Sequence, residues 1–169
     1  MRINLTEKPI GTIFVTNTSY NGNLSGIAGA DAKCMARAQA GGLIGTWVAL
    51  LSNSTLNMTN RISDRVYQRM DGKIIANNKA DLFDGSIQNA IGQNEFGLGR
   101  GVFPLDLVVH TGSTIQGTKV ANANCNNWIS SSQSVSSYQG KSSQTNYQWN
   151  NWGGNGCNLN ASLYCMRVS

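Results

Sequence analysis

The stretch GADAKCMARAQAGGLIGTWVALLS, residues 29–52, decides the fold. Its first half is rich in alanine, a strong helix former, and we place Asp31 in the first turn, where a carboxylate favours the positive end of the helix dipole. Gly41-Gly42 supplies the left-handed position that ends a helix. The apolar run centred on Trp47 has the length of a buried strand. The stretch therefore predicts a short helix and a buried strand, with Cys34 on the helix in need of a partner.

The length and composition indicate one extracellular domain. The 169 residues contain only 12% charged side chains, while Asn, Ser, Thr, Gln and Gly are abundant, which is typical of a loop-rich β protein. The net charge of +5 fits an acidic partner such as a sulfated glycan, nucleic acid or anionic membrane, but it also fits simple solubility. No apolar run is long enough for a transmembrane helix, and no signal peptide is visible. We therefore expect no membrane insertion and, for an exported protein, a chain whose signal has been removed.

The rest of the chain reads as short strands separated by polar loops. Asp71-Gly72 lies between two alternating segments and predicts a hairpin turn. Residues 112–158 are almost continuous Ser, Asn, Gln and Gly, and we expect an ordered loop pinned by cysteines and tryptophans. Residues 1–9 are polar and predict a linker. Strands are expected within residues 11–18, 45–51, 66–70, 73–76, 107–110 and 161–168.

The cysteines favour two disulfides. Their number is even and no CxxC pair occurs, which argues against a zinc ribbon or a thioredoxin-type site. Four cysteines allow three pairings, and the sequence alone leaves the choice open. Pairing Cys34 with Cys165 would tie the two ends of the domain together, and pairing Cys125 with Cys157 would staple the polar loop.

Several segments resemble a known family. They are VYQRMDGKIIANNKADLFDG (66–85), VVHTGSTIQG (108–117), CNNW (125–128) and LYCMRV (163–168), together with the opening stretch. They resemble the bacterial endostatin-like branch of the C-type-lectin-like fold, as in leptospiral endostatin-like surface proteins and the C-terminal domain of the Legionella collagen-like adhesin.

The resemblance implies an α+β, C-type-lectin-like domain over residues 10–169. Such a domain has a mixed or antiparallel sheet, one or two helices and a long disulfide-stapled loop region. The nested family pattern implies the bridges Cys34–Cys165 and Cys125–Cys157. It also implies a homotrimer in which residues 1–9 are a linker or the trimer-forming segment.

The chain departs from sugar-binding C-type lectins in its calcium ligands. Its prolines, Pro9 and Pro104, form no Glu-Pro-Asn or Gln-Pro-Asp triplet, and residues 107–169 contain no Asp or Glu. Calcium needs hard, charged oxygen ligands, so we expect no metal and no cofactor. His110 is the sole histidine, no GxSxG motif occurs, and the cysteines are expected to be oxidised. We therefore predict no catalytic residue and no enzymatic activity.

The basic residues carry the functional prediction. Arg and Lys bind sulfate groups through charge-assisted hydrogen bonds, although a solvated surface would look the same in sequence. The aromatic residues Trp128, Tyr147, Trp149 and Trp152 are either a core under the loop or a stacking platform for sugar rings. The expected glycosaminoglycan-binding residues are Lys33, Arg37, Arg61, Arg65, Arg69, Lys73, Lys79, Arg100, Lys119 and Lys141.

The resemblance implies a secreted or surface-exposed bacterial adhesin domain. It would bind sulfated glycosaminoglycans of the heparin, heparan or chondroitin sulfate type, attach to host cells or matrix, and participate in biofilm. We expect no nucleic-acid partner. Two alternatives stay open: a module that binds extracellular-matrix or complement proteins, and a trimerisation cap of a collagen-like stalk.

Overall fold

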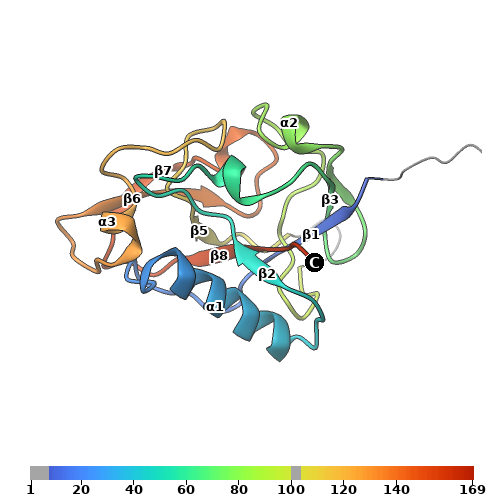
Figure 1. Cartoon of the computed structure of the whole chain (residues 1–169), viewed down its shortest axis with the longest axis horizontal. Helices are drawn as coiled ribbons and strands as arrows, with labels where there is room; N and C mark the ends of the chain where they lie inside the picture. Colours follow the sequence, from blue (N-terminus) through green and yellow to red (C-terminus); the bar gives the residue numbers. More distant parts are fainter. Residues whose placement is uncertain (1–7, 100–103) are drawn as a thin grey trace, which may run out of the picture.

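The computed structural model describes residues 8–99 and 104–169, so Arg100 and most of the expected N-terminal linker lie outside the described part. The elements surround one mixed sheet with the strand order β4-β3-β1-β8-β5-β6-β7, and β2 also pairs with β8 (Figure 1). The strands are β1 (Ile10–Val15), β2 (Trp47–Ala49), β3 (Val66–Gln68), β4 (Ile74–Ala76), β5 (Val108–His110), β6 (Ser136–Lys141), β7 (Gly153–Gly156) and β8 (Ser162–Arg167). The helical elements are α1 (Gly26–Ala40), η1 (Met58–Arg61), α2 (Lys79–Leu82), α3 (Cys125–Trp128) and η2 (Tyr147–Trp149).

The last strand, β8, lies at the centre of the sheet. It pairs antiparallel with β1 and β2 and parallel with β5, while β1 also pairs parallel with β3. The hairpin predicted at Asp71-Gly72 is confirmed, because β3 and β4 are antiparallel and Gly72 has a φ of +84°. The predicted α+β class with a mixed sheet is likewise confirmed.

Helix α1 begins earlier than expected. It starts at Gly26, so Asp31 lies in the second turn, and the expectation that it lies in the first turn is wrong. Its carboxylate instead accepts a hydrogen bond from the Ala49 backbone N–H at 2.9 Å and pairs with Arg61. The helix ends as predicted, since Gly42 has a φ of +70°. Asp31 thus ties the helix to β2, a tertiary contact that helix propensity does not encode.

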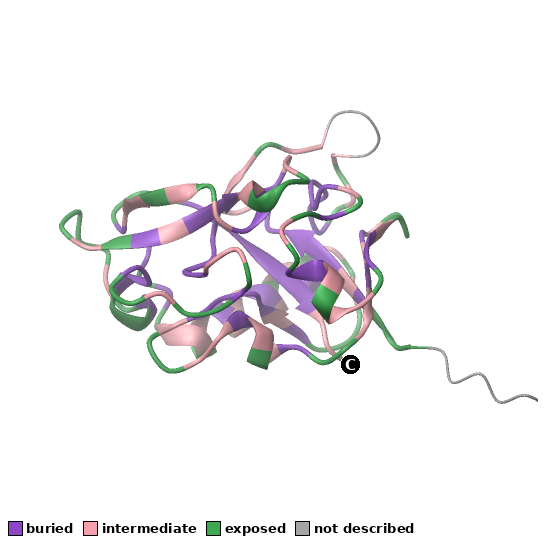
Figure 2. Ribbon diagram, turned by 90° about the horizontal axis from the view of Figure 1, so that it is seen from above, coloured by how far each residue is buried: buried purple, intermediate pink, exposed green. Residues whose placement is uncertain are grey.

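The strands at the centre of the sheet are mostly buried (Figure 2), and their side chains alternate between two core clusters. One core cluster gathers around Ile13, Tyr67 and Trp149, and the other, beneath α1, contains Phe14 and Trp128. The second cluster includes all four cysteines, whose side chains are inaccessible to solvent.

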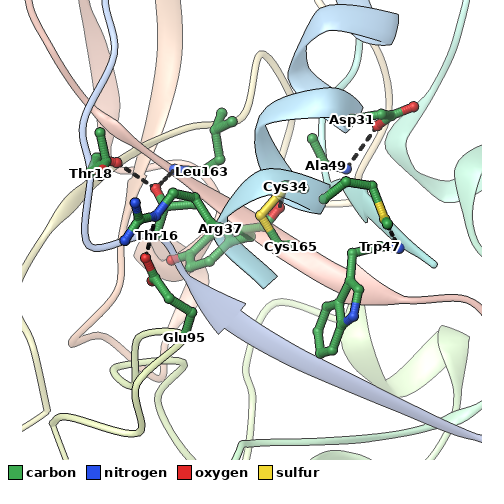
Figure 3. Close-up of a disulfide and its surroundings, with 12 residues drawn as sticks. Thr16, Thr18, Asp31, Cys34, Arg37, Trp47, Ala49, Glu95, Leu163 and Cys165 are labelled. Carbon is green, nitrogen blue, oxygen red and sulfur yellow. Dashed lines mark hydrogen bonds and ion pairs between the residues drawn. A yellow bond between two sulfur atoms is a disulfide. The ribbon is translucent and has the colours of Figure 1, made fainter. Parts of the chain in front are cut away.

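The predicted disulfide pairing is confirmed. Cys34 is bonded to Cys165 and Cys125 to Cys157, and Figure 3 shows the first bridge between α1 and β8. In the chain-entropy picture the first bridge contributes about 5 kcal/mol and the second about 4 kcal/mol to stability.

The polar stretch 112–158 is ordered, as predicted, but it is not only a loop. It contains β6 and β7, which the sequence analysis missed because SSYQGK and GGNG lack the alternation of apolar side chains that marks a strand. These strands are held by backbone pairing, with Tyr138 opposite Gly154. Trp128 and Trp149 are buried, as a core under the loop predicts, whereas Tyr147 and Trp152 are exposed.

The short element α3 is a single left-handed turn. Its four residues have φ values from +51° to +64°, although none is glycine. Left-handed backbone costs roughly 1–2 kcal/mol per L-residue, and somewhat less for Asn. The turn is held by the Cys125–Cys157 bridge and by Trp128, whose indole N–H donates to the Ser52 carbonyl at 2.8 Å. Tertiary contacts therefore impose a conformation that the local sequence disfavours.

Candidate anion-binding groove

Four of the predicted cationic residues form ion pairs with carboxylates. These pairs are Arg37 with Glu95 at 2.5 Å, Arg61 with Asp31 at 2.6 Å, Arg69 with Asp71, and Lys141 with Asp106 at 3.4 Å. In each pair the carboxylate offsets the positive charge and competes with any external anion. These four residues are therefore less suited to hold a polyanion than a free cation would be.

The Arg37–Glu95 pair contains the most buried carboxylate of these contacts. The Glu95 side chain has no exposed surface, and its second oxygen accepts the Asn17 backbone N–H at 2.8 Å. The Arg37 guanidinium also packs over the Phe96 ring, 5.5 Å from its centre. Figure 3 shows Arg37 reaching from α1 toward Glu95. The contacts of Arg37 with Glu95 and Phe96 therefore hold the 95–96 loop against α1.

Other predicted cations are dispersed over the described surface. Lys33 lies over the Tyr20 ring at 5.5 Å, Lys73 follows the β3–β4 turn, and Lys119 lies in a loop. No contact brings these three lysines to one place, and no ion pair engages them within the described ranges. The structure therefore does not gather the nine described residues of the predicted set into one site.

Arg65 and Arg167 are brought together. Among the arginines that the structure describes, these two form no ion pair, and both line the same hollow of about 340 Å³. The residues that line it are Ile10, Thr12, Arg65, Gln68, Arg167 and Ser169, which we call the Arg65–Arg167 groove. No Asp or Glu is among them. The groove thus combines two positive charges with the polar side chains of Thr12 and Gln68.

The Arg65 side chain is already ordered by neutral acceptors. Its Nε donates to the Ser63 hydroxyl at 2.9 Å, and its terminal nitrogens donate to the carbonyls of Ile10 and Val168 at 3.3 and 2.8 Å. Arg167 donates from Nε to the Ser169 carbonyl at 3.0 Å. Because a guanidinium has five N–H donors, both side chains keep donors for an external anion.

A larger hollow involves Lys8 and Asp64, which lie close in sequence to Ile10 and Arg65 of the groove. Its volume is about 640 Å³, and Lys8, Asp64, Lys79 and Phe83 are among its lining residues. Lys8 Nζ lies 2.8 Å from Asp64, which also accepts the Lys79 backbone N–H. This backbone hydrogen bond, followed by the one from Lys8, lowers the pKa of Asp64 below its usual value, so the carboxylate is ionised at neutral pH.

We use the term basic strip for the four cationic side chains that line the two hollows: Lys8, Arg65, Lys79 and Arg167. Asp64 is the single carboxylate that lines either hollow, so positive charge exceeds negative charge along the strip.

The sequence analysis identified Arg65 and Lys79 but missed Lys8 and Arg167. Arg167 stands alone near the chain end, with no neighbouring cation to mark it. It reaches the groove because β8 pairs with β1 and β2, which places Arg167 opposite Trp47.

His110 has a structural role in the core. Its Nε2 lies 2.8 Å from the Tyr20 carbonyl, and its ring packs edge-on against Trp128. Burial lowers the pKa of His110 from its usual 6.5 to about 4, and the hydrogen bond to Tyr20 only partly opposes this shift. The imidazole is therefore neutral at pH 7, and Nε2 carries the proton that it donates to the carbonyl.

Two further properties concern metals and membranes. Across residues 8–99 and 104–169, His, Cys, Asp and Glu side chains form no cluster of three that could hold a metal ion. The helices of that same part are all too short or too polar to cross a bilayer. The two disulfides fit an extracellular, oxidising environment.

Comparison with known proteins gives one family. The family model described as "Protein of unknown function (DUF1554)" matches residues 17–148, which extend from the loop after β1 into η2 and include Arg65. A search among curated proteins finds no match. Because the family model covers more than half of the sequence, the chain belongs to the DUF1554 family.

Proposed function

We propose that this protein is an extracellular binding module that holds sulfated glycosaminoglycans along the basic strip. The observation that carries the proposal is the Arg65–Arg167 groove, where two arginines that pair with no Asp or Glu line one hollow. Guanidinium groups bind sulfate and carboxylate oxygens through paired, charge-assisted hydrogen bonds. The neutral contacts of Arg65 order its side chain without neutralising its charge.

Lys8 and Lys79 add further cationic contacts, as the binding of a polymer with several sulfates requires. Lys8 and Lys79 line the larger hollow, and we propose that a chain of sulfated sugars contacts them while another of its sulfates pairs with the arginines. Asp64 partly offsets Lys8, and we therefore expect the arginines to contribute more to affinity than the lysines.

The resemblance of the sequence to bacterial endostatin-like domains supports the biological setting. We propose a C-type-lectin-like fold of this branch, a surface adhesin role in attachment to host cells or matrix and in biofilm, and binding without catalysis. We also propose that three copies act together, because three weak basic sites on one assembly sum into useful avidity.

Binding of a heparin-derived oligosaccharide tests the proposal. The variant R65Q/R167Q removes both charges, and the variant K33Q/K73Q removes two charges elsewhere as a matched control. At about 1 kcal/mol per exposed ion pair, loss of the two arginines should weaken binding by roughly thirtyfold at low salt. The control should change affinity by less than about threefold, and high salt should weaken binding of the wild type.

Thermal melting of each variant checks that the fold is intact, since Arg65 also hydrogen-bonds the backbone. Equal weakening by the two double variants would show that heparin senses net charge rather than this groove. Binding that persists unchanged at high ionic strength would contradict the electrostatic basis.

A further inference from the structure

The Arg65–Arg167 groove continues into a second hollow with a different character. The second hollow has a volume of about 230 Å³ and shares Thr12, Gln68 and Arg167 with the first. Its other lining residues are Gly42, Leu43, Ile44, Trp47 and Met70, which we call the apolar extension. The shared residues make one continuous depression that is cationic at one end and aliphatic at the other.

The depression exists because α1 ends before the sheet does. The helix covers Phe14, Ala49 and Cys165, which belong to the same core cluster as its buried face. Thr12 pairs with Gln68, and Arg167 pairs with Trp47. Since Ile13 pairs with Met166 in antiparallel register, Thr12 and Arg167 are the next neighbours across β1 and β8.

These paired positions place Gln68, Thr12, Arg167 and Trp47 in one row across four strands, and the row meets α1 at Trp47. The loop that follows α1 then borders the row with Leu43 and Ile44.

The two ends select different chemical groups. Neither hollow is lined by an Asp or Glu, so the charges of Arg65 and Arg167 are complementary to an external carboxylate or sulfate. At the other end Ile44 is 75% exposed, the highest value among the large apolar side chains of the described surface. Exposed aliphatic surface of this kind favours an apolar partner group. A sulfated sugar chain satisfies the arginines but offers little to the apolar extension.

We propose that this groove binds an extended peptide of a partner protein, with a carboxylate side chain at the arginines and a large aliphatic side chain at the apolar extension. The proposal rests on the proposed function in one respect, since it uses the same two arginines as anion contacts. A peptide fits because the depression is open and follows the direction of β1 and β3.

The distance between the two ends of the groove sets the spacing within the peptide. Arg65 and Met70 are five positions apart in the sequence, and β3 ends at Gln68, so the chain between them is only partly extended. Their separation is therefore shorter than the roughly 17 Å that five fully extended residues would span. Four residues of extended peptide span about 13 Å, and residues i and i+4 of a strand face the same side. The favoured motif is therefore Asp or Glu followed four positions later by Leu, Ile or Met.

Fluorescence anisotropy with a labelled synthetic peptide tests the proposal. The probe is Thr-Asp-Thr-Ser-Thr-Leu-Thr with blocked ends, compared with versions in which Asp is replaced by Asn or Leu by Ser. Partial burial of a leucine contributes about 1 kcal/mol, so each replacement should raise the dissociation constant roughly fivefold.

Protein variants separate this proposal from the preceding one. I44S should weaken the peptide about fivefold and leave heparin oligosaccharide binding unchanged, whereas R65Q/R167Q should weaken both. The matched control is I129S, which replaces another exposed isoleucine beside α3 and should affect neither ligand.

Lack of binding of the probe to the wild-type protein, or equal binding to I44S and I129S, would overturn the peptide proposal. Heparin binding that still depends on the two arginines would then leave the glycosaminoglycan proposal standing. Unaltered heparin binding by R65Q/R167Q would overturn the glycosaminoglycan proposal. If I44S still weakened peptide binding, the peptide proposal would remain standing.

Discussion

The left-handed turn α3 predicts that glycine and alanine will reverse their usual order of stability. Asn126 lies in this turn with φ +52° and ψ +56°, and its side chain is exposed. Replacing it by alanine keeps a Cβ that clashes with the following carbonyl oxygen in left-handed backbone. Replacing it by glycine removes the clash but increases the conformational freedom of the unfolded chain.

The two effects differ enough in size to decide the sign. The left-handed penalty for an L-residue is roughly 1–2 kcal/mol, and the additional entropy cost of glycine is roughly 0.5–1 kcal/mol. N126G should therefore be more stable than N126A by about 0.5–1 kcal/mol. For a domain of this length, 1 kcal/mol corresponds to a shift of about 2–4 °C in melting temperature.

Ala36 provides the matched control, because it is exposed in the right-handed helix α1. There A36G should lower the free energy of unfolding by about 1 kcal/mol relative to the wild type. Thermal and urea denaturation of N126G, N126A, A36G and the wild type, with disulfides intact, measure all four stabilities. If N126G proves less stable than N126A, the turn is not left-handed in solution or its strain is released elsewhere.

Two further predictions concern buried charge. His110 has a pKa near 4 in the folded protein and about 6.5 in the unfolded chain, so the unfolded state binds more protons between these values. The free energy of unfolding should therefore fall by about 3 kcal/mol from pH 7 to pH 4, and urea denaturation at the two pH values measures this. An equal fall in H110Q would contradict the low pKa of His110. R37M should lower the free energy of unfolding at pH 7 by about 3 kcal/mol in the same assay, because the fully buried Glu95 carboxylate loses its partner. An unchanged free energy of unfolding would show that the Arg37–Glu95 pair is not formed.

Local patterns predicted most of the regular structure. Alternation and the Asp71-Gly72 turn identified the β3–β4 hairpin, and the apolar run around Trp47 identified β2. The resemblance to bacterial endostatin-like domains implied that Cys34 pairs with Cys165. The hairpin and β2 depend on residues close in sequence, so they are visible without coordinates.

The candidate site could be predicted only in part. Arg65 was recognised as a cation, but no local signal indicated that Arg37, Arg61 and Arg69 pair with carboxylates and that Arg65 does not. Glu95 lies 58 residues from Arg37 in the sequence, so their pairing depends on how α1 packs against the 95–96 loop.

Composition, spacing and the cysteine pattern determined a basic, disulfide-bonded α+β domain. The tertiary structure decided which cationic side chains form ion pairs within the fold and which remain available to a ligand. It placed Arg167 beside Arg65, exposed the sheet beyond α1, and imposed the left-handed turn on residues 125–128. The physical reason is that charge pairing and backbone strain depend on distances between segments remote in sequence, whereas helix and strand patterns depend on neighbours along the chain.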